Sequence, residues 1–348
     1  MNTPAAHAPM GHDAAPGWGE AALARVDRFS SLRIGVLGDL IADLYTYGRP
    51  VRLSREAPVM IVREEREELI PGGAANTIAN LRDLGATVIP VGVVGDDAIG
   101  ERLLGRLVEA GVDCRGIRVL DEYRTVAKTR LLAGDVHTVK QQVVRIDREP
   151  NRETTAAESA ALVETLERFG GEVDAWIVSD YGYAAASPAA VDWVRSRSRR
   201  GGEGVPTVAA SRYRLGAFHG FTVVTPNESE FCEAFGLDAP GEAELLEAGF
   251  ACRDRLEGEA LLVTRGNRGM MLIAQGSEPL EIPIHGSDDI VDVSGAGDTV
   301  ASVLTLALAA GAGLPEACRL ANVASGLTVM KRGAATITPD ELRRELRR

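Results

Sequence analysis

The chain has 348 residues, enough for one large α/β domain or two modest ones. Its hydrophobic content of 45% and charged content of 25% are those of an ordinary soluble globular protein. The net charge of −12 excludes a broad nucleic-acid-binding surface, which would need a basic face, but leaves room for a local basic pocket.

Residues 1–20 are rich in Ala, Pro, Gly and His and have neither the basic start nor the apolar stretch of a signal peptide. They predict a disordered tail, followed by one domain over residues 21–348. The apolar run Ala301–Ala310 is too short to span a bilayer and predicts a buried helix, so neither a membrane nor a nucleic acid is expected as partner. Scattered cysteines without a C-x-x-C pair indicate reduced thiols in a cytoplasmic protein: Cys114, Cys232, Cys252 and Cys318.

The first predicted strand, Arg33–Leu37, is apolar and ends at Gly38, with Asp39 and Asp43 close behind it. In an open α/β sheet, the residues just past the carboxyl end of a strand line the ligand crevice. Asp39 and Asp43 are therefore candidate acceptors for ligand hydroxyl groups. The alternative for Asp39 is that it caps a turn.

Two stretches, about residues 44–70 and 123–148, alternate apolar and polar side chains, the pattern of half-exposed strands. Such strands fit poorly inside a buried parallel sheet and predict a small β-sheet lid on the main domain. In an acidic chain, a basic cluster on a lid is suited to face a phosphate group. The alternative is ordinary surface charge. The cluster comprises Lys128, Arg130, Lys140 and Arg145.

Gly72 and Gly73 precede a predicted helix whose first turn contains Asn76. Two glycines let a ligand approach the backbone closely, and the amide of Asn76 offers both a donor and an acceptor. A Gly-Gly turn alone is a weak signal. From here the chain alternates between strands and helices, which predicts a parallel sheet.

Polar residues follow two later strands. Ala175–Ser179 leads into Asp180, and Thr222–Val224 is followed by Asn227 and Glu230. An amide and a carboxylate at a strand end could hold Mg²⁺ through waters against a phosphate. The same residues equally predict an N-capped helix with an acidic first turn. The sequence does not separate the two.

The strand Ala260–Thr264 leads into a tight turn whose residues Gly266 and Gly269 could lie against the ribose and phosphates of a nucleotide. A helix rich in small residues, Leu320–Lys331, contains Asn322 and could pack beside an adenine.

The small residues Gly295, Ala296 and Gly297 precede Asp298 at the start of a helix predicted over residues 299–310. They let backbone N–H groups approach an anion, and the helix start adds unpaired donors and the positive end of its dipole. This is a phosphate cradle. Asp298 could deprotonate a hydroxyl that attacks phosphorus, and the helix terminus is expected to lower its pKa from about 3.9. The alternative is a Gly-rich turn with Asp298 as N-cap.

Together these stretches resemble the ribokinase-like PfkB family of carbohydrate kinases, over nearly all of Arg33–Leu346. The resemblance implies a doubly wound α/β domain, with a mostly parallel sheet, helices on both faces and a small β-sheet lid that often forms a homodimer interface. It implies ATP as phosphoryl donor and Mg²⁺ as helper. The motifs that carry it are Gly72-Gly73 with Asn76, Thr225-Pro226-Asn227 with Glu230, Thr264-Arg265-Gly266, and Asp292–Thr299.

By position, the resemblance makes Asp298 the catalytic base and residues 295–297 the anion hole. It makes Asn227 and Glu230 the Mg²⁺ and phosphate region. The sugar contacts that it implies are Asp39, Gly72, Gly73 and Asn76.

Within the family the chain is most similar to the D-glycero-D-manno-heptose 7-phosphate kinases, including the kinase half of the bifunctional heptose kinase/adenylyltransferases. This implies phosphorylation of the anomeric hydroxyl to give the 1,7-bisphosphate, with Lys128, Arg145 and Asp180 at the substrate. The stretches that carry it are Ser54–Val59, Gln141-Gln142 with Arg145 and Asp147, Val178–Tyr181, and Asp298–Val300 through Leu320–Asn322.

Three positions depart from that pattern: Ser294 stands in place of Thr, Ala210 in place of an acidic residue, and Tyr183 near a usual lysine. No H-x-G-H motif is present, so nucleotide-sugar formation would need a separate nucleotidyltransferase. The alternatives are a PfkB-type kinase of another sugar, sugar phosphate or nucleoside, and a non-catalytic sugar- or nucleotide-binding homologue. A dinucleotide oxidoreductase is disfavoured because no complete G-x-G-x-x-G follows the first strand.

Overall fold

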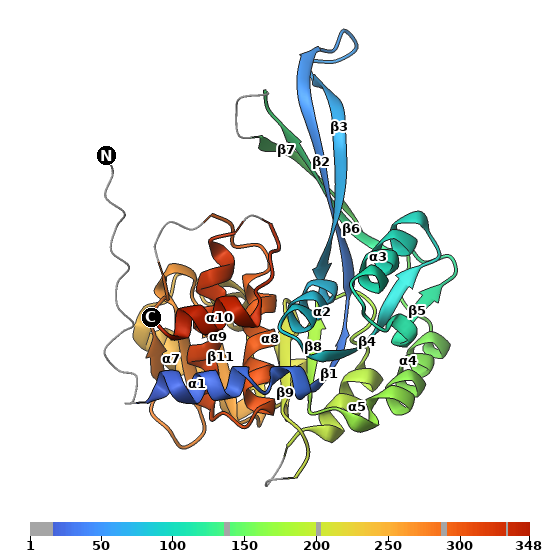
Figure 1. Cartoon of the computed structure of the whole chain (residues 1–348). Helices are drawn as coiled ribbons and strands as arrows, with labels where there is room; N and C mark the ends of the chain where they lie inside the picture. Colours follow the sequence, from blue (N-terminus) through green and yellow to red (C-terminus); the bar gives the residue numbers. More distant parts are fainter. Residues whose placement is uncertain (1–16, 136–139, 200–202, 287–290, 332) are drawn as a thin grey trace, which may run out of the picture.

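The computed structural model describes residues 17–135, 140–199, 203–286, 291–331 and 333–348. Within these ranges a large sheet flanked by helices forms the main body, and a second, smaller sheet projects from it (Figure 1). Helix α1 (Trp18–Val26) begins inside the segment expected to be a tail, and its Trp18 and Ala22 are buried in the core. The predicted tail over residues 1–20 therefore extends too far toward the helix, because residues 18–20 belong to α1. Residues 1–16 lie outside the described residues.

The described part of the large sheet is mostly parallel, as predicted. The strands from β11 to β5 run parallel, while β12 and β13 extend the other edge in antiparallel pairing. In order across the sheet, the strands are β13 (Leu280–Ile282), β12 (Met270–Ala274), β11 (Ala260–Thr264), β10 (Val223–Val224), β9 (Thr207–Ser211), β8 (Ala175–Asp180), β1 (Arg33–Gly38), β4 (Thr87–Gly95) and β5 (Ile117–Leu120).

Helices cover both faces of this sheet, and each face has its own hydrophobic core. Successive side chains of β8 point to opposite faces, so Ile177 packs in one cluster while Trp176 and Val178 pack in the other. One face is covered by α1, α2 (Ala74–Asp83), α3 (Ala98–Glu109), α8 (Ala296–Ala309), α9 (Leu314–Val329) and α10 (Pro339–Leu346). The other is covered by α4 (Ala156–Phe169), α5 (Pro188–Arg197), α6 (Glu228–Phe235) and α7 (Glu242–Leu256).

Burial on both faces explains why the central strands are continuous apolar runs. Short 3₁₀ turns complete the described secondary structure: η1 (Phe29–Ser31), η2 (Cys114–Gly116), η3 (Gly170–Glu172), η4 (Leu215–Phe218) and η5 (Gly266–Arg268).

The smaller sheet, here called the β-lid, has the strand order β3-β2-β6-β7. Its strands are β2 (Leu40–Leu53), β3 (Met60–Gly73), β6 (Val126–Ala133) and β7 (Gln141–Arg148). The β2–β3 hairpin reaches far from the main body (Figure 1). Because β2 starts two residues after β1 ends, and β3 runs directly into α2, the base of the β-lid stands at the carboxyl edge of the large sheet.

Helix α8 is the buried helix that the sequence predicted. Two arginines of the α1 region close its carboxyl end: Arg28 Nη1 lies 2.6 Å and Arg25 Nη1 3.1 Å from the Ala310 carbonyl oxygen. The positive guanidinium groups also balance the negative end of the helix dipole. Over the ranges the structure describes, no helix has both the length and the apolarity to cross a bilayer.

We expect Arg28→Ala to lower the free energy of unfolding by about 1–2 kcal/mol, the worth of a partly buried, charge-assisted hydrogen bond. Urea denaturation measures this. Arg118→Ala is the matched control, because the exposed side chain of Arg118 has no hydrogen-bond or ion-pair partner among the described residues. Equal stability of the two variants would show that the capping bond contributes nothing.

Candidate active site

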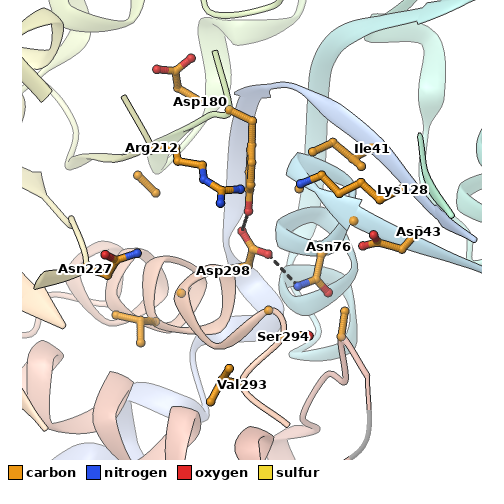
Figure 2. A pocket seen from close by; sticks show the side chains of 18 of the residues that line it. Ile41, Asp43, Asn76, Lys128, Asp180, Arg212, Asn227, Val293, Ser294 and Asp298 are labelled. Carbon is orange, nitrogen blue, oxygen red and sulfur yellow. Dashed lines mark hydrogen bonds between the residues drawn. The ribbon is translucent and has the colours of Figure 1, made fainter. Parts of the chain in front are cut away.

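A cavity of about 500 Å³ lies between the carboxyl ends of β8–β11 and the base of the β-lid. This is the edge at which open α/β sheets bind ligands. Most of the residues predicted as functional line it, although they come from widely separated parts of the chain (Figure 2). They are Asp43, Gly72, Gly73, Asn76, Lys128, Arg145, Asp180, Asn227, Glu230, Thr264, Gly295, Gly297 and Asp298.

Asp39 is not among the lining residues. Its carboxylate accepts four backbone N–H bonds from the loop after β8, at 2.8–3.1 Å. Burial raises the pKa of Asp39, and these N–H groups counteract that rise. Asp39 was expected to contact a ligand hydroxyl, but its carboxylate is occupied by the loop, which agrees with the alternative that it caps a turn. Asp39 fixes a loop, and the donors are the amides of Tyr181, Tyr183, Ala184 and Ala185.

Three residues expected at a nucleotide also lie outside the cavity lining. Gly269 has a φ of 81°, and a Cβ there would lie 2.0 Å from the Ile282 carbonyl oxygen. This clash within the protein explains the glycine without any contact to a nucleotide. The Asn322 side chain donates to the Pro283 carbonyl oxygen at 2.7 Å. Gly266 has open space around its Cβ position. Their contact with a nucleotide stays a prediction.

The loop before α8 presents unpaired donors to the cavity. Gly295 is the N-cap, with a φ of 79°. Among the described residues, the N–H groups of Gly295, Gly297 and Asp298 have no acceptor. Ala296 departs from the prediction, because its N–H donates to Val293 at 3.2 Å and it does not line the cavity. The arrangement suits an anion held by the remaining amides.

The carboxylate of Asp292 holds this loop in place. It accepts the N–H of Ser294 and the N–H of Gly333, each at 2.9 Å. Burial acts to raise the pKa of Asp292, but these hydrogen bonds outweigh it and hold the pKa below its ordinary value. Asp292 is therefore a scaffold for the amides rather than a second base.

Asp298 is only 7% exposed and is hydrogen-bonded on both oxygens. Asn76 Nδ2 donates to Oδ2 at 2.8 Å, while the hydroxyls of Tyr181 and Thr77 donate to Oδ1 at 3.1 and 3.3 Å. Burial raises the pKa of Asp298 to about 6, although the three donors lower it. The expectation of a lowered pKa was wrong, because the loss of water around the carboxylate outweighs the donors and the helix terminus.

Four basic side chains surround the cavity: Lys128, Arg130, Arg145 and Arg212. Two of them are neutralised, Arg130 by Asp43 at 2.5 Å and Arg145 by Asp147 in a two-point contact. The Lys128 ammonium lies 5.4 Å from the Tyr181 ring centroid, and burial lowers its pKa. Lys128 and Arg212 make no side-chain hydrogen bond or ion pair within the described residues, so they are the cations left for a ligand.

Lys140, the fourth member of the predicted basic cluster, points elsewhere and contacts Glu65 and the Gly48 carbonyl, each at 2.7 Å. Tyr181 and Arg212 were not predicted as site residues. The available signal was their position directly after strands β8 and β9, the same rule that found Asp180. Asp180 itself lines the cavity, but its carboxylate is engaged by Arg214, Ser211 and the Gly182 amide.

Asn227 and Glu230 form a capping box at the start of α6, with reciprocal bonds of 2.8 and 2.9 Å. The N-capped helix that the sequence offered as the alternative to a metal site is therefore present, yet both residues also line the cavity. Burial raises the pKa of Glu230, and its Oε1 keeps no partner in the described structure. Over the described ranges, no group of three His, Cys, Asp or Glu side chains could hold a metal ion.

The model of the PfkB family of carbohydrate kinases matches residues 33–341. The chain belongs to the PfkB family. It is thus a carbohydrate kinase, an enzyme that transfers a phosphoryl group to a sugar hydroxyl. The PfkB match spans the large sheet, the β-lid and the loop before α8 together.

Among curated relatives, the chain is 40% identical over 322 residues to the bifunctional protein HldE of Pseudomonas aeruginosa PAO1 and 39% identical over 318 residues to that of Citrifermentans bemidjiense. The matches cover 92% and 91% of this chain but only 65% and 63% of those proteins. The chain therefore spans less than two thirds of their length.

Solved structures share the fold at low sequence identity. A ribokinase from Arabidopsis thaliana, complexed with ribose and ATP, has a TM-score of 0.71 at 19% identity and covers 91% of this chain and 99% of its own. Phosphofructokinase-2 from Escherichia coli, in complex with potassium, has a TM-score of 0.72 at 16% identity, with coverages of 91% and 100%.

Two glycine substitutions distinguish a glycine that the conformation of the loop requires, Gly295, from one that borders open space in the cavity, Gly297. Gly295→Ala should cost at least about 1–2 kcal/mol of stability because of its positive φ, and the new Cβ would lie 2.5 Å from Asn76 Nδ2. Gly297→Ala has nothing within 4 Å and should keep or raise stability, yet reduce turnover by crowding the free amides. Thermal melts and steady-state rates test both; full activity of Gly297→Ala would place the phosphoryl group elsewhere.

Proposed function

We propose that the protein is an ATP-dependent kinase that phosphorylates the anomeric hydroxyl of D-glycero-D-manno-heptose 7-phosphate to give the 1,7-bisphosphate. The observation that carries the proposal is the meeting of Asp298 and the free amides at the start of α8 with unpaired cations across one cavity. The similarity to relatives named HldE supports the choice of sugar.

In this reaction Asp298 accepts the proton of the attacking hydroxyl while the Gly297 and Asp298 amides stabilise charge on the phosphoryl group. Phosphoryl transfer asks little covalent chemistry of the protein, so positioning and charge stabilisation supply most of the rate. A carboxylate with a pKa near 6 is a better base than a solvated one and is still ionised at neutral pH.

The residues toward α6 fit a magnesium ion. Asn227 and the free Oε1 of Glu230 could hold Mg²⁺ through waters, where the ion would neutralise phosphate charge. Thr264 pairs with Asn227 along the backbone, and Thr225 also lines the cavity, which supports the proposal that the nucleotide binds at this end.

The β-lid side of the cavity suits an anionic sugar. Lys128 on β6 carries unpaired positive charge there, Arg145 lies on the neighbouring strand β7, and the unpaired Arg212 follows β9 of the large sheet. A sugar phosphate supplies the negative charge that these groups lack. Asp43, Asn76 and the backbone of Gly72 and Gly73 then surround the sugar hydroxyls.

The β-lid also supports a proposal about assembly and context. It exposes apolar side chains that a second copy could cover, as expected for a homodimer through the β-lid. They are Val51, Leu53, Val59, Met60, Val143, Val144 and Ile146. We place the enzyme in the cytoplasm.

An ADP-release assay with heptose 7-phosphates, ribose, fructose 6-phosphate and adenosine tests the substrate. Lys128→Ala should raise the KM for the sugar phosphate about tenfold or more and leave the KM for ATP nearly unchanged, because the ammonium faces the acceptor. Lys140→Ala, whose amine is already paired, is the control. Equal effects of the two variants, or better turnover of an uncharged sugar, would contradict the proposed acceptor.

Asp298→Asn should lower kcat by about 10²–10⁴-fold while ATP binding, measured by calorimetry, is retained. In the wild type the ionised carboxylate is the active form, so kcat/KM should rise with pH and reach half its maximum near the pKa of about 6. Below that value the rate should fall about tenfold per pH unit. A flat profile from pH 5 to 8 would remove Asp298 from the proton transfer.

A further inference from the structure

The two oxygens of Asp298 are not equivalent. Oδ1 accepts from two hydroxyls, those of Tyr181 and Thr77, whereas Oδ2 accepts only from Asn76 Nδ2. A carboxylate oxygen has two lone pairs, so both lone pairs of Oδ1 are engaged and Oδ2 keeps one free. Figure 2 shows Asn76 bonded to Asp298 from the side of α2.

The orientation of Asn76 is itself fixed. Asn80 Nδ2 donates to the Asn76 side-chain oxygen at 3.3 Å, which turns the Asn76 amide nitrogen toward Asp298. Thr299 in turn donates to the Asn80 side-chain oxygen at 3.1 Å. This network holds Oδ2 at a defined place in the cavity wall.

Tyr181 is held equally firmly on the other side. Its N–H donates to Asp39 Oδ2 at 2.8 Å, and the next residues of the loop donate to the same carboxylate. Asp180 directly precedes Tyr181 in the chain, and its carboxylate accepts hydrogen bonds from Arg214 and from the hydroxyl of Ser211. A loop clamped before and after Tyr181 leaves its hydroxyl little freedom.

We propose that Tyr181 is a positioning residue whose hydroxyl occupies Oδ1 of Asp298, so that Oδ2 alone receives the proton of the acceptor hydroxyl. The inference rests on the role of Asp298 as base in the proposed function. Asp39 acts one step further back, since it holds the loop that delivers Tyr181.

A hydrogen bond to the charged form of a carboxylate favours that form, so the Tyr181 hydroxyl also keeps Asp298 more acidic than its burial alone would. Removing the hydroxyl should therefore raise the pKa of Asp298. Other charged groups facing the carboxylate come from β2, β6, the loop after β9 and α6, and a Tyr181 variant leaves them in place. They are Asp43, Lys128, Arg212 and Glu230.

The test compares Tyr181→Phe with Tyr183→Phe in the full chain. Tyr183 lies on the same loop and also donates its N–H to Asp39, but it lines a neighbouring cavity and does not contact Asp298. Infrared difference spectra against Asp298→Asn follow protonation of this one carboxyl group in the unliganded protein. Melting temperatures check that each variant is folded.

Tyr181→Phe should move the protonation midpoint of Asp298 upward by about one pH unit, the size expected of one hydrogen bond to an ionised group, and Tyr183→Phe should leave it unchanged. The acid limb of kcat/KM should shift by the same amount, and the plateau of kcat should fall about tenfold with little change in the KM for ATP. Superimposable infrared titrations of Tyr181→Phe and the wild type would overturn the inference.

The two proposals fail separately. A wild type that turns over no sugar or sugar phosphate contradicts the proposed function, whereas the infrared titration needs no substrate. A shifted midpoint with an unchanged kinetic profile would show that Tyr181 bonds to Asp298 without controlling proton transfer, which also overturns the inference.

Discussion

The site depends on backbone N–H groups at the amino end of α8 that have no hydrogen-bond acceptor in the described part of the chain. The terminal N–H and C=O groups of a buried helix normally need hydrogen-bond partners, and in α8 this need is met at the carboxyl end. Its carboxyl end is closed by Arg25 and Arg28, whereas the amides of Gly297 and Asp298 open onto the cavity without acceptors among the described residues. Since the helix is embedded in the core along its length, those amides cannot relax toward another partner, and they stay available for an anion, which we propose is the phosphoryl group.

The same burial sets the basicity of Asp298, the proposed base. Asp298 lies in the first turn of α8, where a helix terminus favours the ionised carboxylate, but the surrounding helices and the β8 loop remove its water. Desolvation is the larger effect and moves the pKa toward neutrality. One packing arrangement thus supplies both an anion-binding backbone and a carboxylate basic enough to accept a proton, with Asn76 and Tyr181 as the contacts that keep it ionised and oriented.

Much of this organisation could be predicted from local patterns. Strand-helix alternation gave the parallel sheet, period-2 alternation gave the β-lid, and the small residues before Asp298 marked the start of a buried helix. What could not be predicted are contacts between distant segments. Asp39 and Asp43 are four residues apart and both follow β1, yet only the loop after β8, more than 140 positions later, decides that Asp39 binds amides while Asp43 faces the cavity. The pKa of Asp298 was missed for the same reason, because its burial is a tertiary property.

The charge pairs around the cavity bear on how an acidic protein could receive the phosphorylated acceptor proposed for it. Of the four surrounding cations, Arg130 and Arg145 are held by carboxylates of the β-lid itself, so they shape the cavity without adding net charge. Lys128 and Arg212 remain uncompensated, on opposite walls formed by the β-lid and the large sheet. Burial is the main influence that lowers the pKa of Lys128; Asp43 opposes it and Arg212 adds to it, so an anionic group bound between the two cations would stabilise the charged ammonium. A neutral sugar would not offset that burial, which is the physical reason why the proposed acceptor carries its own phosphate.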